Sequence, residues 1–158
     1  MNPQFFAELI YNQIKLPPNK QELRRIAQSQ YSVFLSQTAP SPSLEVVQKF
    51  VNRLLTRCHI CDEQLLQAYM LITRLNKRID FSINPYSWQK LVTVSFQLLN
   101  KFFNDKYVWV KQICAVSGIQ DVELVKLEML FTELVEFDLY YSEDDYKNDW
   151  AAMQKLKI

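Results

Sequence analysis

Apolar residues recur at intervals of three and four positions through most of this chain, the spacing that gathers them on one face of an α-helix. Short polar or proline-containing stretches interrupt this pattern and divide it into eight helical segments. The pattern therefore predicts helices over residues 4–15, 20–37, 42–58, 62–79, 84–104, 108–117 and 121–136, and a last helix that starts at Ser142.

Particular residues mark where these helices begin and end. The Pro17–Pro18 pair ends the first helix, because proline removes a backbone donor. Ser41 is suited to cap the helix that begins at Pro42, and Asp62 is suited to cap the next one. Gly118 ends a short helix, because glycine readily adopts the left-handed conformation just past a helix end.

Three of the helices have features that bear on their place in the fold. Residues 84–104 are apolar on nearly all sides, which is typical of a central helix. The apolar face of the helix over residues 4–15 is expected to pack on the domain. The alternative is that this helix binds a partner protein. Acids at 143–145 and the late lysines Lys155 and Lys157 suit the dipole of the last helix, with partner binding as the alternative for the acids.

Two charged residues stand where this periodicity predicts little water. Lys101 lies between Leu99 and Phe102 near the end of the central helix, and Glu128 lies within the apolar part of the helix over 121–136. A charge held away from water is costly unless it is paired. The residues alone allow several interpretations. In one interpretation, the charge of Lys101 stabilises the negative end of the helix dipole while its methylene chain covers apolar surface. In another, Glu128 reaches solvent or pairs within the chain with Lys126 or Lys101. Alternatively, the two charges pair at a surface that another protein covers.

Composition restricts the class of protein. The 158 residues suffice for one domain, and 49% hydrophobic residues with a single glycine favour an all-α fold. A net charge of +1 provides no basic field for nucleic acid. We expect no membrane insertion, since no apolar run approaches the roughly 18 residues that a span needs, and no secretory signal. Three cysteines in such a chain suggest reduced thiols, in the cytoplasm, the nucleus or both.

The segment Cys58-His59-Ile60-Cys61 has the spacing of a metal-binding motif. A zinc site needs four ligands, and the only other cysteine is Cys114, while His59 is the only histidine. These cysteines are therefore interpreted as small buried hydrophobes, and we expect no metal and no cofactor. A single histidine and the lack of a glycine-rich loop also argue against an enzyme, so no catalytic residue is predicted.

Two segments of the chain resemble the cyclin box. LVTVSFQLLNKFFNDKYVWV (91–110), followed about one helix later by LVKLEMLFTELVEFDL (124–139), is similar to the third and fifth helices of that box. Lys101 occupies the lysine position of the family's Leu-Ala-Ser-Lys-Phe run, and Glu128 stands at the family's distance before Phe-Asp-Leu. The flanks INPYSWQKLV and NDKYVW look most similar to the cyclin Y and Pho80-like branch.

The resemblance implies an architecture and a set of binding residues. The architecture is a five-helix cyclin box over 42–139, with an N-terminal helical extension over 1–41 and a C-terminal helix over 140–158. The implied contacts with a cyclin-dependent kinase are made by Lys101, Glu128, Leu98, Phe102, Phe137 and Leu139. Of the box's other motifs, the first helix lacks the Met-Arg-Ala-Ile-Leu substrate-docking sequence and reads VVQKFVNRLL instead, and the second-helix acid is replaced by Thr73, although Arg74 remains.

The resemblance also implies a function and a kind of partner. Cyclins of this branch bind kinases of the PCTAIRE, PFTAIRE or Pho85 type at the αC helix and thereby activate them, contributing no catalytic atom. The expected partner is thus a cyclin-dependent protein kinase, with no small-molecule substrate, no nucleic acid and no membrane. The alternative is a cyclin-fold adaptor that binds transcription machinery or nucleic acid, but that function would require a row of lysine and arginine residues along one face.

Overall fold

The structure of the protein is a computed structural model that describes residues 1–16, 19–36, 42–105 and 108–156. Within these ranges it is all-α and contains no strand, in agreement with the predicted fold class. The elements in chain order are α1 (Pro3–Ile14), α2 (Lys20–Ala27), the 3₁₀ helix η1 (Gln30–Phe34), α3 (Leu44–Cys58), α4 (Asp62–Ile79), α5 (Trp88–Phe103), α6 (Val110–Ser117), α7 (Asp121–Leu134) and α8 (Glu143–Lys155).

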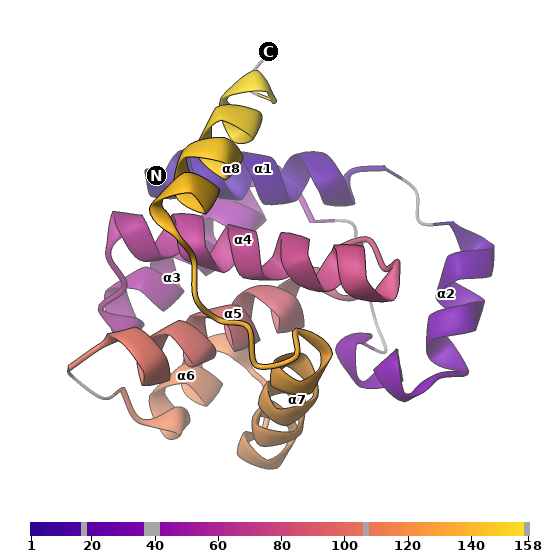
Figure 1. Ribbon diagram of the computed structural model, residues 1–158. Helices are drawn as coiled ribbons and strands as arrows, with labels where there is room; N and C mark the ends of the chain where they lie inside the picture. Colours follow the sequence, from indigo (N-terminus) through magenta and orange to yellow (C-terminus); the bar gives the residue numbers. More distant parts are fainter. Residues whose placement is uncertain (17–18, 37–41, 106–107, 157–158) are drawn as a thin grey trace.

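The helix α5 forms the middle of the bundle, as its nearly continuous apolar surface predicts. It packs against α4 on one side and against α6 and α7 on the other, and its residues from Leu91 to Asn100 are all buried. Figure 1 shows α5 below α4, with α6 and α7 lower still. Burial on all sides explains why the sequence of α5 shows no polar face.

Several buried positions of α5 carry polar side chains, and two of these bond within the helix. The hydroxyl groups of Thr93 and Ser95 donate to the carbonyl oxygens of Gln89 and Val92 within the same helix. Gln97 differs, because it is fully buried and neither polar atom of its amide has a hydrogen-bond partner in the described ranges. A buried polar group without a partner costs about 1–3 kcal/mol of stability.

We expect the substitution Gln97→Leu to raise the free energy of unfolding by about 1–3 kcal/mol, because it replaces an unpaired amide with an apolar group of similar volume. Urea titration with an unchanged m-value measures this difference. The exposed Gln89 on the same helix provides the matched control, and Gln89→Leu should leave stability nearly unchanged. A loss of stability in Gln97→Leu would show that this amide is bonded in solution.

The first helix is built into the core. The side chains of Phe6, Ile10 and Ile14 are at most 2% exposed, and α1 packs on α3 and α4. The ring of Phe6 lies 5.7 Å from the ring of Phe96 on α5, centroid to centroid. Asn2 caps the helix through a hydrogen bond of 2.7 Å from the Phe5 amide. The apolar stripe of α1 thus faces inward, as the packing interpretation expects.

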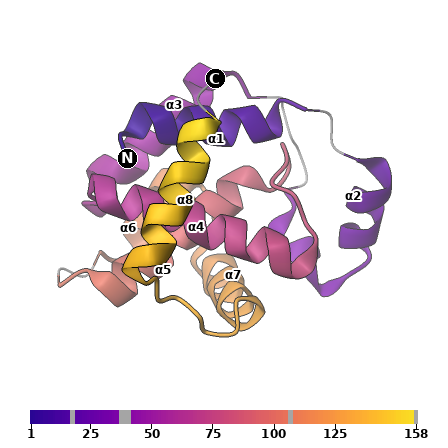
Figure 2. The same ribbon diagram turned by 45° about the horizontal axis from the view of Figure 1, so that its top comes forward.

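The prediction of one helix over residues 20–37 is wrong. The described residues form two short elements, α2 and η1, because Ser29 interrupts the first helix and caps the second through the amide of Tyr31. The helix α2 buries only Ile26 and stands to one side of the bundle in both Figure 1 and Figure 2. Besides the buried Ile26, Glu22 holds α2 to the bundle by accepting a 2.8 Å hydrogen bond from the amide of Ser82.

The starts of three helices differ from the predicted caps. Ser43 caps α3 by accepting from the Val46 amide. The predicted cap Ser41 lies outside the described residues, and Pro42 precedes the helix. Cys61, rather than Asp62, is the cap of α4, and its amide donates to the side chain of Gln64. A turn over residues 84–87 delays the start of α5 to Trp88.

The predicted end of a helix at Gly118 and the predicted start of the last helix at Ser142 are confirmed. Gly118 adopts φ 75° just after α6, where a glycine avoids the clash of a Cβ atom. Ser142 opens α8 and exchanges hydrogen bonds with Asp145, so one acid of the predicted run serves helix initiation. Residues Pro17–Pro18, Lys106 and Tyr107 of the NDKYVW flank, and Lys157 lie outside the described residues.

The last helix passes in front of α1 in Figure 1 and crosses both α4 and α1 in Figure 2. Trp150 stacks edge-on against Phe5 at 6.3 Å, and the Tyr146 hydroxyl accepts a hydrogen bond from Gln67 of α4. Met153 is buried. None of the helices in the described ranges combines the length and the apolar character needed to cross a bilayer.

Candidate functional site

The two charges singled out in the sequence meet at the junction of α5 and α7. Nζ of Lys101 lies 2.6 Å and 2.8 Å from the two carboxylate oxygens of Glu128, so the ammonium group bonds both oxygens of one carboxylate. The Lys101 side chain is 31% exposed and that of Glu128 is 16% exposed. The partner of Glu128 in this structure is therefore Lys101 and not Lys126. The pair forms within the chain and remains partly open to solvent.

Neighbouring residues hold both charges in place. On α7, Leu124, Leu127 and Phe131 face the core, so Glu128 lies at the edge of the buried stripe. On α5, Asn100 precedes Lys101 and donates a 3.2 Å hydrogen bond to the carbonyl oxygen of Val108. That bond ties the end of α5 to the start of the next helix. The ion pair is thus supported by rigid elements on both sides.

Polar side chains from three segments extend this support at the end of α5. Asn104 donates to the side-chain oxygen of Asn100 at 3.1 Å, and Gln64 of α4 donates to the side-chain oxygen of Asn104 at 2.6 Å. Sequence reasoning did not include these amides in the site. The contact of Gln64 with Asn104 gave no signal in the sequence, because only the folded chain brings α4 to the end of α5.

Two of the four predicted apolar contact residues are exposed and two are buried. Phe102 is 57% exposed and Phe137 is 72% exposed, whereas Leu98 is 1% exposed and Leu139 is 8% exposed. The prediction that Leu98 and Leu139 offer contact surface therefore needs correction. Leu98 lies one helical turn before Phe102 in α5, where neighbouring helices cover it, and Leu139 packs into the core. Both residues therefore belong to the core under the site.

Other exposed apolar residues of the site were missed. Phe103 at the end of α5 is 44% exposed, and on α7 Val122, Val125 and Met129 are between 43% and 63% exposed. The three residues of α7 follow the i, i+3, i+7 spacing of a second apolar face. The signal in the sequence was an α7 that is apolar on two sides. Exposed apolar residues at helical spacing, next to a charged pair, are typical of a protein-binding surface.

The exposed face of α3 carries one exposed apolar side chain, Val46, rather than such a surface. Val47, Phe50 and Val51 point into the core, while Lys49 and Arg53 are exposed and polar. This is the first helix of the predicted box, where larger cyclins dock substrate peptides on apolar residues. The absence of exposed leucine or isoleucine in the described α3 agrees with the departure noted in the sequence.

The Cys58-His59-Ile60-Cys61 segment has a structural explanation. Cys58 is fully buried in the core, and burial raises the pKa of its thiol to about 11. His59 adopts a left-handed conformation that ends α3, and Cys61 caps α4. Among the residues that the structure describes, no three histidine, cysteine, aspartate or glutamate side chains are grouped so as to hold a metal ion.

Comparison with known proteins agrees with this geometry. The fold is an all-α bundle in which a partly exposed ion pair lies between the third and fifth of five consecutive helices, α3 to α7. The family model described as Cyclin matches residues 12–139, which is most of the chain, and the chain belongs to the cyclin family.

A curated relative supports the predicted Pho80-like branch. The PHO85 cyclin-like protein psl1 of Schizosaccharomyces pombe is 26% identical over 115 residues, which cover 72% of this chain and 46% of the relative. The chain therefore spans about half the length of the curated relative that it matches.

Proposed function

We propose that this chain is the regulatory subunit of a cyclin-dependent protein kinase, and that it binds and activates the kinase at its αC helix. The observation that carries the proposal is the partly exposed Lys101–Glu128 pair, beside exposed Phe102 and Phe137. The kinase is proposed to be of the PCTAIRE, PFTAIRE or Pho85 type, and the name of the relative supports the Pho85 type.

The chemistry of the ion pair suits a partner that presents backbone groups. An ammonium group has three protons, and two of those of Lys101 are directed at Glu128, so one is left for a carbonyl oxygen of the partner. The Glu128 carboxylate keeps lone pairs for backbone N–H groups of the partner. Because the pair is formed before binding, docking requires no reorganisation of either charge.

Activation follows from a shift of population. A protein kinase is active when its β3 lysine pairs with the αC glutamate around the ATP phosphates. A cyclin that binds the αC-in state more tightly than the αC-out state moves the kinase towards the active form by that difference in affinity. The chain itself supplies no catalytic group in this scheme, and we propose that it acts in the cytoplasm, the nucleus or both.

Reconstitution with a purified Pho85-type kinase tests the proposal. Mixing the two proteins is expected to give a complex on gel filtration and an increase in the rate of peptide phosphorylation, with no activity from the chain alone. A PCTAIRE- or PFTAIRE-type kinase tested in parallel separates the choices within the branch. If the folded chain binds none of the kinases tested, the proposal is wrong. Capture of nucleic acid or transcription factors would then favour the adaptor function.

A further inference from the structure

The backbone makes an unusual corner after α7, which we call the α7 corner (residues 135–141). Glu136 and Phe137 have φ values of 55° and 58°, so two successive residues with side chains adopt the left-handed conformation. Their amides donate 2.9 Å hydrogen bonds to the carbonyl oxygens of Glu133 and Thr132. This is the bonding pattern of a Schellman helix end, but a glutamate occupies the position where glycine is usual.

Arg74 of α4 holds the far half of this corner. Its guanidinium group donates to the backbone carbonyl of Asp138 and lies 3.1 Å from the carboxylate of the same residue. It also donates to the carbonyl oxygen of Tyr140 at 3.3 Å and lies 4.1 Å from the ring centroid of Tyr141. With 20% exposure, the Arg74 side chain is largely covered by the segment that it binds.

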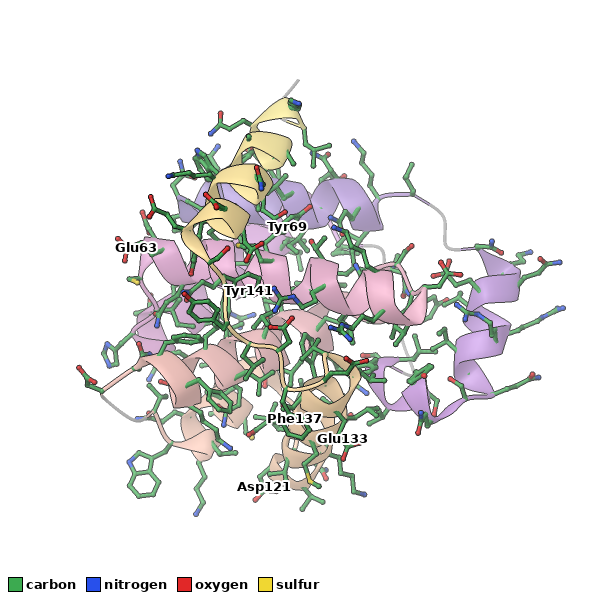
Figure 3. All side chains as sticks on the ribbon, in the orientation of Figure 1. Glu63, Tyr69, Asp121, Glu133, Phe137 and Tyr141 are labelled. Atoms are coloured by element: carbon green, nitrogen blue, oxygen red, sulfur yellow. The ribbon has the colours of Figure 1, made fainter. Side chains whose placement is uncertain are left out.

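Arg78, one turn further along α4, holds the near half. Its guanidinium lies 2.8 Å from the carboxylate of Glu136 and 3.9 Å from that of Asp138. Glu136 is one of the two left-handed residues, so this ion pair acts where the backbone is least favourable. Together the two arginines contact residues 136, 138, 140 and 141 and leave Phe137 between them, 72% exposed. Figure 3 shows Phe137 at the C-terminal end of α7, beside Glu133.

We propose that Arg74 and Arg78 are positioning residues that fix the α7 corner so that Phe137 is presented, already in place, to the kinase. The inference rests on the proposed function and extends it to a pair of residues that do not touch the partner. Strained backbone that persists in a structure is held by its surroundings and is concentrated at functional sites. An anchor that is ordered before binding loses less entropy when the complex forms.

A double-mutant cycle measures whether the arginines act through Phe137. Phe137→Ala is expected to weaken binding to the reconstituted kinase by at least about 30-fold, as a hot-spot aromatic does. Arg78→Ala and Arg74→Lys are each expected to weaken it by about tenfold, a coupling of the size measured between interacting residues. In the Phe137→Ala background the same two substitutions should have no further effect. Additive losses, or no loss at all, would overturn the proposal.

Relief of the backbone strain provides a rescue that a purely structural role would not predict. Glu136→Gly supplies a residue that adopts the left-handed conformation without the Arg78 ion pair. The double variant Arg78→Ala/Glu136→Gly is expected to recover most of the affinity that Arg78→Ala loses. Arg53→Ala on the exposed face of α3 serves as the matched control and should bind as wild type. A double variant that stays as weak as Arg78→Ala would contradict positioning through the corner.

Hydrogen exchange of the free chain separates failure of this inference from failure of the proposed function. The amide of Phe137 bonds the carbonyl oxygen of Thr132 in α7, and that of Asp138 bonds the carbonyl oxygen of Val135. Both amides should exchange more rapidly in Arg78→Ala but not in the glycine double variant. If wild type binds no kinase but exchange responds in this way, the proposed kinase role is wrong, whereas the proposal that the two arginines fix the α7 corner is supported. If wild type binds the kinase and neither exchange nor affinity responds to Arg78→Ala, the proposal that the arginines fix the α7 corner is wrong.

Discussion

Exchanging the two charges of the site, as Lys101→Glu with Glu128→Lys, is expected to abolish kinase binding while the fold survives. The double variant keeps an ion pair between α5 and α7, and a partly exposed pair contributes only about 0–1 kcal/mol to stability. At the interface, however, every charge-assisted hydrogen bond to the partner is reversed. Loss of a buried, hydrogen-bonded charge at an interface costs about 2–5 kcal/mol, so affinity should fall by about 100-fold or more.

Calorimetric titration of the kinase measures this loss, and circular dichroism with urea unfolding checks the fold. The helix dipole makes a glutamate at the end of α5 slightly unfavourable, by about 0.3–1 kcal/mol, which the unfolding curve will show. The pair Glu45–Lys49 on α3, at 2.7 Å and exposed, is the matched control. Its exchange should leave binding unchanged. If the Lys101/Glu128 exchange binds as wild type, the pair has only an internal role and the proposed interface is wrong.

Truncating Phe6 is expected to destabilise the whole protein by about 3–5 kcal/mol, the cost of removing a fully buried phenylalanine. The side chain fills the space between α1 and α5, where its ring meets that of Phe96. Because domains of this size are stable by only about 5–15 kcal/mol, Phe6→Ala should lower the midpoint of urea unfolding markedly. Thermal and urea unfolding followed by circular dichroism measure the effect.

Leu16, just beyond α1, provides the control because it is 63% exposed, and Leu16→Ala should change stability by no more than about 0.5 kcal/mol. The comparison also decides between the two interpretations of the first helix. A large loss in Phe6→Ala means that α1 is part of the domain core. A loss of less than about 1 kcal/mol would mean that α1 does not hold the core together in solution, and would favour a role in gripping the partner.

Regular apolar spacing made most helices of this protein predictable. The stripe of α1, the continuous apolar surface of α5, the glycine after α6 and the acidic start of α8 all act within one or two turns of helix. The errors came from short-range competition that spacing does not capture. In residues 20–37, the Ser29 side chain satisfies backbone groups that a continuous helix would have used.

The sequence by itself determined the fold class, the two unusual charges and, through them, the resemblance to cyclins. Only the tertiary structure decided that Lys101 and Glu128 bond each other, that Phe102 and Phe137 are exposed, and that Leu98 and Leu139 are not. It also decided that Arg74 and Arg78 hold the α7 corner. Helix formation depends on neighbours within a few positions, whereas burial and ion pairing depend on which distant segments the packed chain brings together.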